Sequence, residues 1–143
     1  MKPINETTIP VPTEHQEQVD FFNRVRCLMP IHPELGLMFA VPNGEHRNMS
    51  VAKRLKAEGV KPGVPDIVLP VARGKYHGLY IEMKRRPYRD KRGHRVTPGP
   101  KPEQRFFIES LVEQGYRAVV RNGSDDAFEA LMEYLEFGAS EGR

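Results

Sequence analysis

The sequence predicts a mixed α/β domain in which helices cover both faces of a central mixed sheet. Two observations carry this prediction. Four segments place apolar residues at helical spacing, and four short apolar runs, bounded by Pro, Gly or Asn, have the length of strands. Their order along the chain is helix, strand, helix, strand, strand, helix, strand, helix. With 143 residues, 38% of them hydrophobic, the chain has the size and composition of one folded domain.

The first helix is expected to follow an N-terminal arm, residues 1–12, which contains three prolines and no periodicity. Thr13 precedes Gln16 by three residues, the spacing of a capping box. The single cysteine, Cys27, excludes an internal disulfide, and its apolar neighbours predict a buried thiol. Apolar residues recur at helical intervals up to a proline, and the face that they predict to lie in the core contains Val19, Phe22, Val25 and Met29.

A short strand and a second helix come next. Residues 37–41 form an apolar run that predicts a strand, and a turn at 42–44 closes it. The spacing of apolar residues then predicts a helix over 48–58, capped by Asn48 or Ser50. The outer side of this helix is basic.

The last third of the chain predicts a helix, a strand and a helix. An apolar helical face extends over 102–115, and the run at 116–120 reads as a strand. Ser124 or Asp125 is expected to cap the final helix. The core positions predicted for that helix are Ala127, Leu131, Tyr134 and Leu135. We expect one domain over 13–137, with a C-terminal tail at 138–143.

A basic segment precedes that helix. Residues 85–101 contain seven Lys or Arg and His94 against one acid, Asp90. Pro and Gly occur along the segment and are expected to break any helix or strand in it. A basic loop has the charge expected of a contact with a phosphate backbone. The alternative is a solvated surface loop that is basic by accident.

No stretch of the sequence approaches the roughly 20 consecutive apolar residues of a membrane span. The first residues also lack the apolar centre of a signal peptide. We therefore expect a cytoplasmic protein without a membrane partner.

Two adjacent predicted strands, at 66–71 and 79–84, have acids at their ends. If the strands pair antiparallel, Asp66 and Glu82 lie at the same edge of the sheet, where two carboxylates repel unless a cation lies between them. Mg²⁺ favours one or two carboxylates together with substrate phosphates. Lys84 shares a face with Glu82 and could orient an attacking water or neutralise charge in a transition state. The alternative is a salt bridge between Glu82 and Lys84 where the strand reaches solvent.

The sequence GVPD at 63–66, followed by IEMK at 81–84, resembles the signature of the PD-(D/E)xK nuclease superfamily. Within that superfamily the chain resembles the VRR-NUC (virus-type replication-repair nuclease) group. Five motifs occur in the same order: TEHQEQ at 13–18, VPNG at 41–44, GVPD at 63–66, IEMK at 81–84 and PEQ at 102–104. The resemblance implies a restriction-endonuclease-like core in which the helix at 48–58 is an insertion. The chain resembles small stand-alone members from phages and bacteria, which implies a protein of the bacterial cell, encoded by the bacterium or by a phage.

The resemblance also implies roles for individual residues. Asp66, Glu82 and the backbone carbonyl of Met83 would bind Mg²⁺ or Mn²⁺, and Lys84 would be the catalytic lysine. Gln104 would help to hold the site. The first helix would supply a further acid, for which Glu14 is preferred over Glu17. The residues predicted to contact DNA are Asn43, Arg47, Lys53, Arg85, Arg86, Arg89, Lys91, Arg92, Arg95 and Lys101.

The function implied is hydrolysis of DNA phosphodiester bonds by a structure-specific endonuclease. Stand-alone members resemble junction-resolving enzymes, homodimers that cut four-way (Holliday) junctions during recombination or repair. No motif for reading bases is present in the sequence, so backbone shape would set specificity. Two alternatives stay open: a nuclease directed to flaps, nicks or ends, and a non-catalytic DNA-binding module with a nuclease fold.

Overall fold

The structure is a computed structural model that describes residues 10–43 and 48–138. Its elements are α1 (Glu14–Leu28), a short 3-10 helix η1 (Pro33–Leu37), β1 (Phe39–Ala40), α2 (Met49–Ala57), β2 (Ile67–Leu69), β3 (Leu79–Lys84), β4 (Tyr88–Arg89), β5 (Arg95–Val96), α3 (Pro102–Glu113), β6 (Arg117–Asn122) and α4 (Ser124–Glu136). No helix in the described part of the chain is long and apolar enough to cross a membrane.

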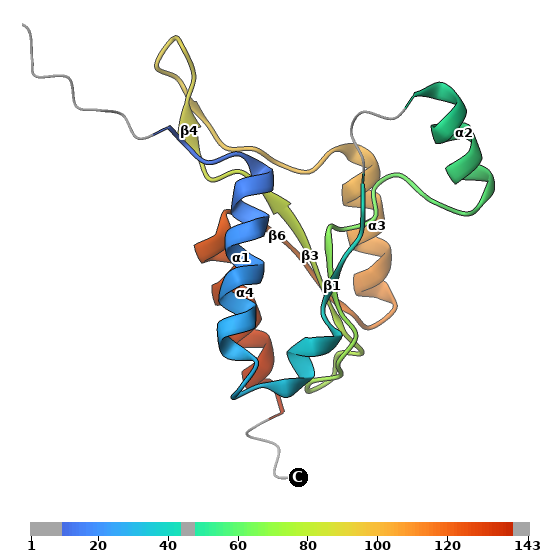
Figure 1. Cartoon of the computed structure of the whole chain (residues 1–143), viewed down its shortest axis with the longest axis vertical. Coiled ribbons are helices and arrows are strands. Elements are labelled where there is room, and N and C mark those ends of the chain that lie inside the picture. Colours follow the sequence, from blue (N-terminus) through green and yellow to red (C-terminus); the bar gives the residue numbers. More distant parts are fainter. Residues whose placement is uncertain (1–9, 44–47, 139–143) are drawn as a thin grey trace, which may run out of the picture.

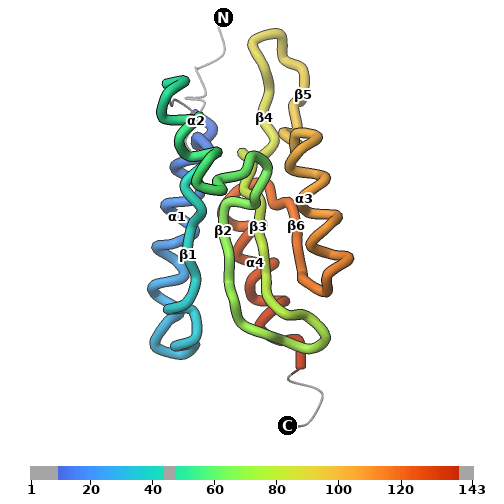
Figure 2. Tube along the Cα trace, turned by 90° about the vertical axis from the view of Figure 1, so that its right-hand side faces the viewer, coloured from blue at the N-terminus to red at the C-terminus, as the bar shows by residue number. Residues whose placement is uncertain are grey.

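The central sheet has four strands in the order β1-β2-β3-β6. The predicted antiparallel pairing of the two acid-bearing strands is confirmed, with Ile67 opposite Ile81. β6 runs parallel to β3, so the sheet is mixed. α1 and α4 cover one face and α3 covers the other (Figures 1 and 2). The predicted fold class, a mixed sheet flanked by helices, is therefore confirmed.

Strand β3 divides its side chains between the core and the site. Leu79, Ile81 and Met83 are buried in the main core, packed with residues of α1 and α4. Since side chains two apart in a strand share a face, Glu82 and Lys84 point to the opposite side of the sheet. A central strand thus carries two charged side chains into the protein at its C-terminal end.

Most of the predicted core face of α1 is confirmed, because Val25 is buried and Phe22 and Met29 pack against the core. Phe21 and Val25 are buried, but Val19 is exposed. Cys27 is exposed too, so the prediction of a buried thiol is wrong. The buried face includes a charged residue, Glu17, which a pattern of apolar residues alone could not place. The buried face therefore also contains Phe21 and Glu17, and leaves out Val19.

The basic segment is also more ordered than predicted. β4 and β5 form an antiparallel hairpin within 85–101, where the sequence predicted no strand. The Asp90 carboxylate accepts the N–H groups of Arg92 and His94, and this closes the turn. Gly93 takes a positive φ of 80° there. Gly93 and Asp90 thus shape the turn of this hairpin, and the prolines of the segment lie outside its strands.

Two other elements are shorter or more exposed than predicted. The strand expected at 37–41 is reduced to the two residues of β1, because η1 occupies the residues before it. Helix α3 has no buried residue, and Phe106 on its predicted apolar face is exposed. α2 matches its prediction, with the Asn48 side chain accepting the Val51 N–H.

Candidate active site

Three carboxylates from three separate elements meet at one edge of the sheet. Glu14 is the first residue of α1, Asp66 directly precedes β2, and Glu82 lies in β3. Each offers an oxygen within 4.8 Å of the oxygens of the other two. Carboxylates this close repel one another unless a cation or a proton is present. The cluster therefore has the composition of a site for a hard divalent cation.

Two hydrogen bonds fix the carboxylate of Asp66. Its Oδ2 accepts the backbone N–H of Met83 at 2.9 Å, and its Oδ1 lies 3.4 Å from the Asn43 side-chain nitrogen. Asn43 also donates to the carbonyl of Val64 at 2.8 Å. Asn43, predicted to contact DNA, thus supports the chain that carries Asp66. The backbone carbonyl of Met83 stays a predicted ligand.

The carboxylate of Glu82 is fully buried, with 0% of the residue exposed. Its Oε1 accepts the side-chain amide of Gln104 at 2.8 Å, and Gln104 in turn accepts the backbone N–H of Lys101. Its Oε2 is buried and has no hydrogen-bond partner among the described residues. Burial and the neighbouring Asp66 carboxylate raise the pKa of Glu82 to about 8, against the opposing effect of Lys84. An unpartnered buried oxygen within an acidic cluster fits a metal ligand.

Lys84 is 7% exposed, and its Nζ lies 3.4 Å from Oε1 of Glu82. The alternative interpretation of these two residues was a salt bridge where the strand reaches solvent. The ion pair exists, but it is buried and adjoins the acidic cluster. It places a cation where a phosphate bound at the cluster would carry its negative charge.

Glu17, the competitor of Glu14, has a different environment. It is 2% exposed, and its Oε1 lies 2.6 Å from a guanidinium nitrogen of Arg86. Its Oε2 accepts the Ser124 N–H at 3.1 Å and so caps α4 from α1. The expected cap by Ser124 or Asp125 is wrong, because the N-cap residue is Gly123 and no side chain of its own turn caps the helix.

Gly123 is required at that position for two reasons. Its φ is 99°, which disfavours residues with a side chain, and a Cβ there would lie 2.3 Å from Oε2 of Glu17. Nothing in the sequence signals a cap that arrives from more than 100 residues away. The structure thus brings Glu14, and not Glu17, to the acidic cluster.

The predicted DNA contacts fall into two groups. Some arginines are engaged within the protein: Arg86 with Glu17, Arg85 with the carbonyls of Pro12 and Val11, and Arg89 with that of Gly93. Others are exposed without such partners among the described residues. This second group contains Lys53, Lys91, Arg92, Arg95 and Lys101, whereas Arg47 lies outside the described residues.

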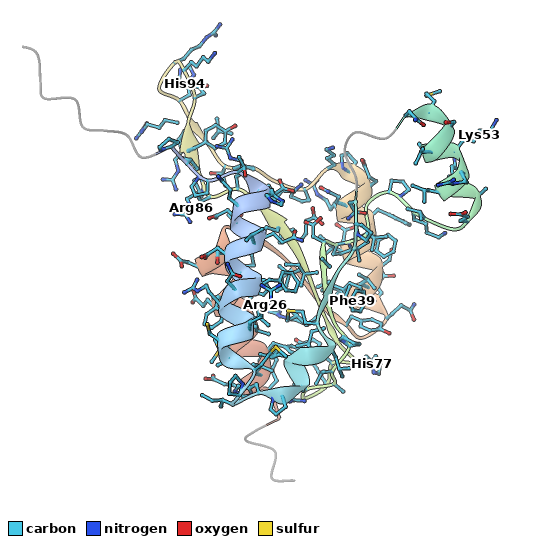
Figure 3. The ribbon with its side chains drawn as sticks, in the orientation of Figure 1. Arg26, Phe39, Lys53, His77, Arg86 and His94 are labelled. Atoms are coloured by element: carbon cyan, nitrogen blue, oxygen red, sulfur yellow. The ribbon has the colours of Figure 1, made fainter. Side chains whose placement is uncertain are left out.

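A cavity of about 570 Å³ lies over the cluster. Glu14, Asp66, Lys84 and Gln104 line one side of it, together with Lys101. The remaining lining includes Lys56 and Lys61, which the sequence analysis did not select as site residues. Figure 3 shows Lys53 on α2 and His94 on the hairpin at the same end of the molecule, on either side of the N-terminus of α1.

Comparison with known proteins identifies the family. The VRR-NUC domain matches residues 24–125, most of the chain. The chain belongs to the VRR-NUC domain family. A solved structure described as a VRR_NUC domain protein is similar, with 28% sequence identity, a TM-score of 0.70, and coverage of 89% of this chain and 91% of that chain. The curated proteins contain no match. The resemblance stated from the five motifs is confirmed.

Membership of the VRR-NUC family indicates a nuclease of the PD-(D/E)xK type. The matched region contains Asp66, Glu82, Lys84 and Gln104, whereas Glu14 lies before it. Glu14 is therefore placed in the cluster by the structure of this chain and not by the family match.

Proposed function

We propose that this VRR-NUC domain is a divalent-metal-dependent DNA endonuclease that cuts four-way junctions as a homodimer. One observation carries the proposal. Glu14, Asp66 and Glu82 converge within 4.8 Å, and the buried ammonium of Lys84 lies beside them. This set of groups suits hydrolysis of a phosphodiester, because a metal ion and a lysine can stabilise the charge that accumulates on the phosphate.

Glu14, Asp66 and Glu82 would hold Mg²⁺ or Mn²⁺, with the backbone carbonyl of Met83 as a further ligand. The donor set fits, because all three side chains are oxygen ligands and one buried oxygen of Glu82 lacks a partner among the described residues. When bound, the ion supplies Lewis acidity and a water of lowered pKa. Gln104 keeps the Glu82 carboxylate in place through its 2.8 Å hydrogen bond.

Lys84 has the role of an electrostatic and orienting group. Its ammonium is held by the strand and by Glu82, so it needs little reorganisation when a phosphate arrives. From this position it donates a hydrogen bond to a non-bridging phosphate oxygen or to the attacking water. Its near-complete burial strengthens both interactions, since water screens them less.

The substrate class rests on the two basic projections. The β4–β5 hairpin and α2 extend from the sheet edge that carries the cluster (Figure 1). Their exposed lysines and arginines can bind phosphates on both sides of a cut. Contacts of this kind depend on the shape of the DNA backbone and not on its base sequence. The likeness to stand-alone family members favours a four-way junction. A homodimer would place one site on each of two symmetric strands.

The test is cleavage of an end-labelled four-way junction, a flap and a linear duplex, each with Mg²⁺ or Mn²⁺. Wild type is compared with Asp66→Asn, Lys84→Met and a charge control, Lys75→Ala, in the loop at the opposite end of β3. We expect paired symmetric nicks in the junction from wild type and the control, and DNA binding without cleavage from the other two. Cuts confined to the flap would replace the junction assignment, and binding without any cleavage by wild type would reject the nuclease.

A further inference from the structure

The outer wall of the catalytic cavity is formed by α2 and the loop after it. Ala52, Leu55, Lys56, Val60 and Lys61 line the same cavity as the acidic cluster. Along the chain this segment lies between β1 and β2. In the structure it faces the cluster across the cavity, at the end of the molecule where the hairpin also lies (Figure 2).

Two of the wall residues are unpaired cations. Lys56 and Lys61 are exposed, and neither side-chain ammonium has an ion-pair or hydrogen-bond partner among the described residues. Arg86 and Arg24, by contrast, are paired with carboxylates. Lys56 lies in the last turn of α2, where the helix dipole favours a cation, but Lys61 lies beyond the helix. The dipole alone therefore does not explain why both lysines face the cavity.

The wall also has an apolar part. Leu55, Val60 and Lys61 border a second hollow of about 270 Å³, whose other walls include Val41 and Val64. Because these three residues line both spaces, the hollow adjoins the catalytic cavity. An apolar surface flanked by lysines matches a nucleotide, which has a charged phosphate and an apolar sugar and base face.

Helix α2 has little support from the rest of the protein. It has nine residues and no buried side chain, and Met49 is 89% exposed. An isolated helix of this length is marginal in water, so contacts with a ligand would add to its stability. The wall is thus an exposed basic surface, continuous with the cluster and only lightly packed.

We propose that this wall binds the nucleotide next to the scissile phosphate. Lys56 and Lys61 hold the neighbouring phosphate, and Leu55 with Val60 contacts the sugar or base between the two phosphates. The assignment rests on the proposed nuclease function and names the part of the protein that positions the strand. Lys53, on the outer side of α2 in Figure 3, does not line the cavity and contributes less.

The experiment measures binding and cleavage of the labelled junction as a function of salt. The variants are Lys56→Ala, Lys61→Ala and Leu55→Ala, with Lys75→Ala as a control of equal charge change. Binding is measured in an Asp66→Asn background, so that the result does not depend on cleavage. For each wall lysine we expect about tenfold weaker binding and a salt slope reduced by about 1, and KM should rise more than kcat falls. Leu55→Ala should weaken binding without changing the slope.

If both lysine variants keep the wild-type salt slope, as Lys75→Ala should, the proposal that the wall binds a nucleotide is wrong. The proposed nuclease function would be unaffected by that result. If wild type cuts no DNA but the lysine variants still show reduced salt slopes, the proposed nuclease function is wrong. The wall would then still be a nucleic-acid contact. Circular dichroism of each variant confirms folding. Because all three side chains lack full burial, their truncation should preserve the fold.

Discussion

Two glutamates are buried almost equally and have opposite surroundings. Glu17, on α1, accepts hydrogen bonds on both oxygens, from Arg86 and from the first turn of α4. Glu82, on β3, has partners on Oε1 alone, and its Oε2 has none among the described residues. The difference teaches that burial of an acid does not indicate its role. Saturation by donors marks a structural carboxylate, and a missing donor marks a place for a ligand.

The charges around the two groups differ in the same sense. Glu17 faces a guanidinium at 2.6 Å, which compensates its burial. Glu82 faces another carboxylate, Asp66, and its pKa is raised to about 8 in spite of Lys84. The first region is electrostatically complete within the chain. The second becomes complete only with a cation or a proton.

The largest effect is expected from Glu82→Gln. Glutamine keeps the shape and a hydrogen bond to Gln104 but removes the negative charge that a metal ion needs. We expect cleavage of the junction to fall by about 10³-fold or more, the scale seen when catalytic groups are removed. Thermal unfolding without metal at neutral pH should occur at or above the wild-type temperature, because folding of the wild type must either protonate Glu82 or bury its charge, and glutamine requires neither. A variant that cuts normally would show that Glu82 is not part of the reaction.

Glu17→Ala is the matching change in the structural region. It leaves the N–H of Ser124 without its acceptor and Arg86 without its partner. We expect the free energy of unfolding, measured with urea, to fall by about 2–3 kcal/mol. Below its unfolding midpoint the variant should retain a kcat near that of wild type. Loss of cleavage in a fully folded variant would show that Glu17 also serves the site.

The pH dependence of stability should separate the two regions further. Because the pKa of Glu82 is raised from 4.5 to about 8, the folded protein binds a proton that the unfolded chain has lost in that range. Metal-free stability should therefore fall as the pH rises from about 4.5 to about 8, by at most about 1.4 kcal/mol per pH unit. Urea unfolding in EDTA at several pH values measures this slope.

Glu82→Gln serves as the reference in that series, since every other titratable group is common to the two proteins and cancels in the difference between them. The stability of wild type relative to Glu82→Gln should fall steadily as the pH rises from about 4.5 to about 8. Parallel curves would mean that Glu82 does not take up a proton on folding.

The smallest effect is expected at an exposed ion pair in the same part of the fold. Arg24 and Asp125 are 2.7 Å apart, nearly as close as Arg86 and Glu17, but the Asp125 side chain is 85% exposed. We expect Asp125→Asn to change the free energy of unfolding by less than about 1 kcal/mol, because water screens the pair. A cost as large as that of Glu17→Ala would mean that distance, and not burial, sets the strength of these pairs.

The residues that converge in the structure could be named from the sequence because they occupy regular positions. Asp66, Glu82 and Lys84 follow from the alternation of strands and from the superfamily signature, and Gln104 follows from a family motif. The choice of Glu14 over Glu17 was open, because both lie in the first turn of one helix. The geometry separates them through contacts with α4, which no local pattern encodes.

The remaining differences arise from long-range packing. Cys27 was predicted to be buried from its neighbours, but it lies outside the buried face of α1, which contains Glu17, Phe21 and Val25. The hairpin in the basic segment depends on the Asp90 side chain, which accepts hydrogen bonds from the backbone N–H groups of Arg92 and His94. The composition of the segment does not predict these turn contacts. Lys56 and Lys61 were not selected because only the three-dimensional position of α2 brings them to the cavity.

The most direct test of the contrast between the two glutamates is calorimetric titration of Mn²⁺ into wild type, Glu82→Gln, Asp66→Asn and Glu17→Gln, all well below their unfolding temperatures. We predict that wild type and Glu17→Gln bind the ion with similar affinity, and that Glu82→Gln and Asp66→Asn lose it. In wild type and Glu17→Gln, binding at neutral pH should also release protons, because Glu82 must lose its proton. Undiminished binding by Glu82→Gln, or its loss in Glu17→Gln alone, would contradict the assignment of the metal site.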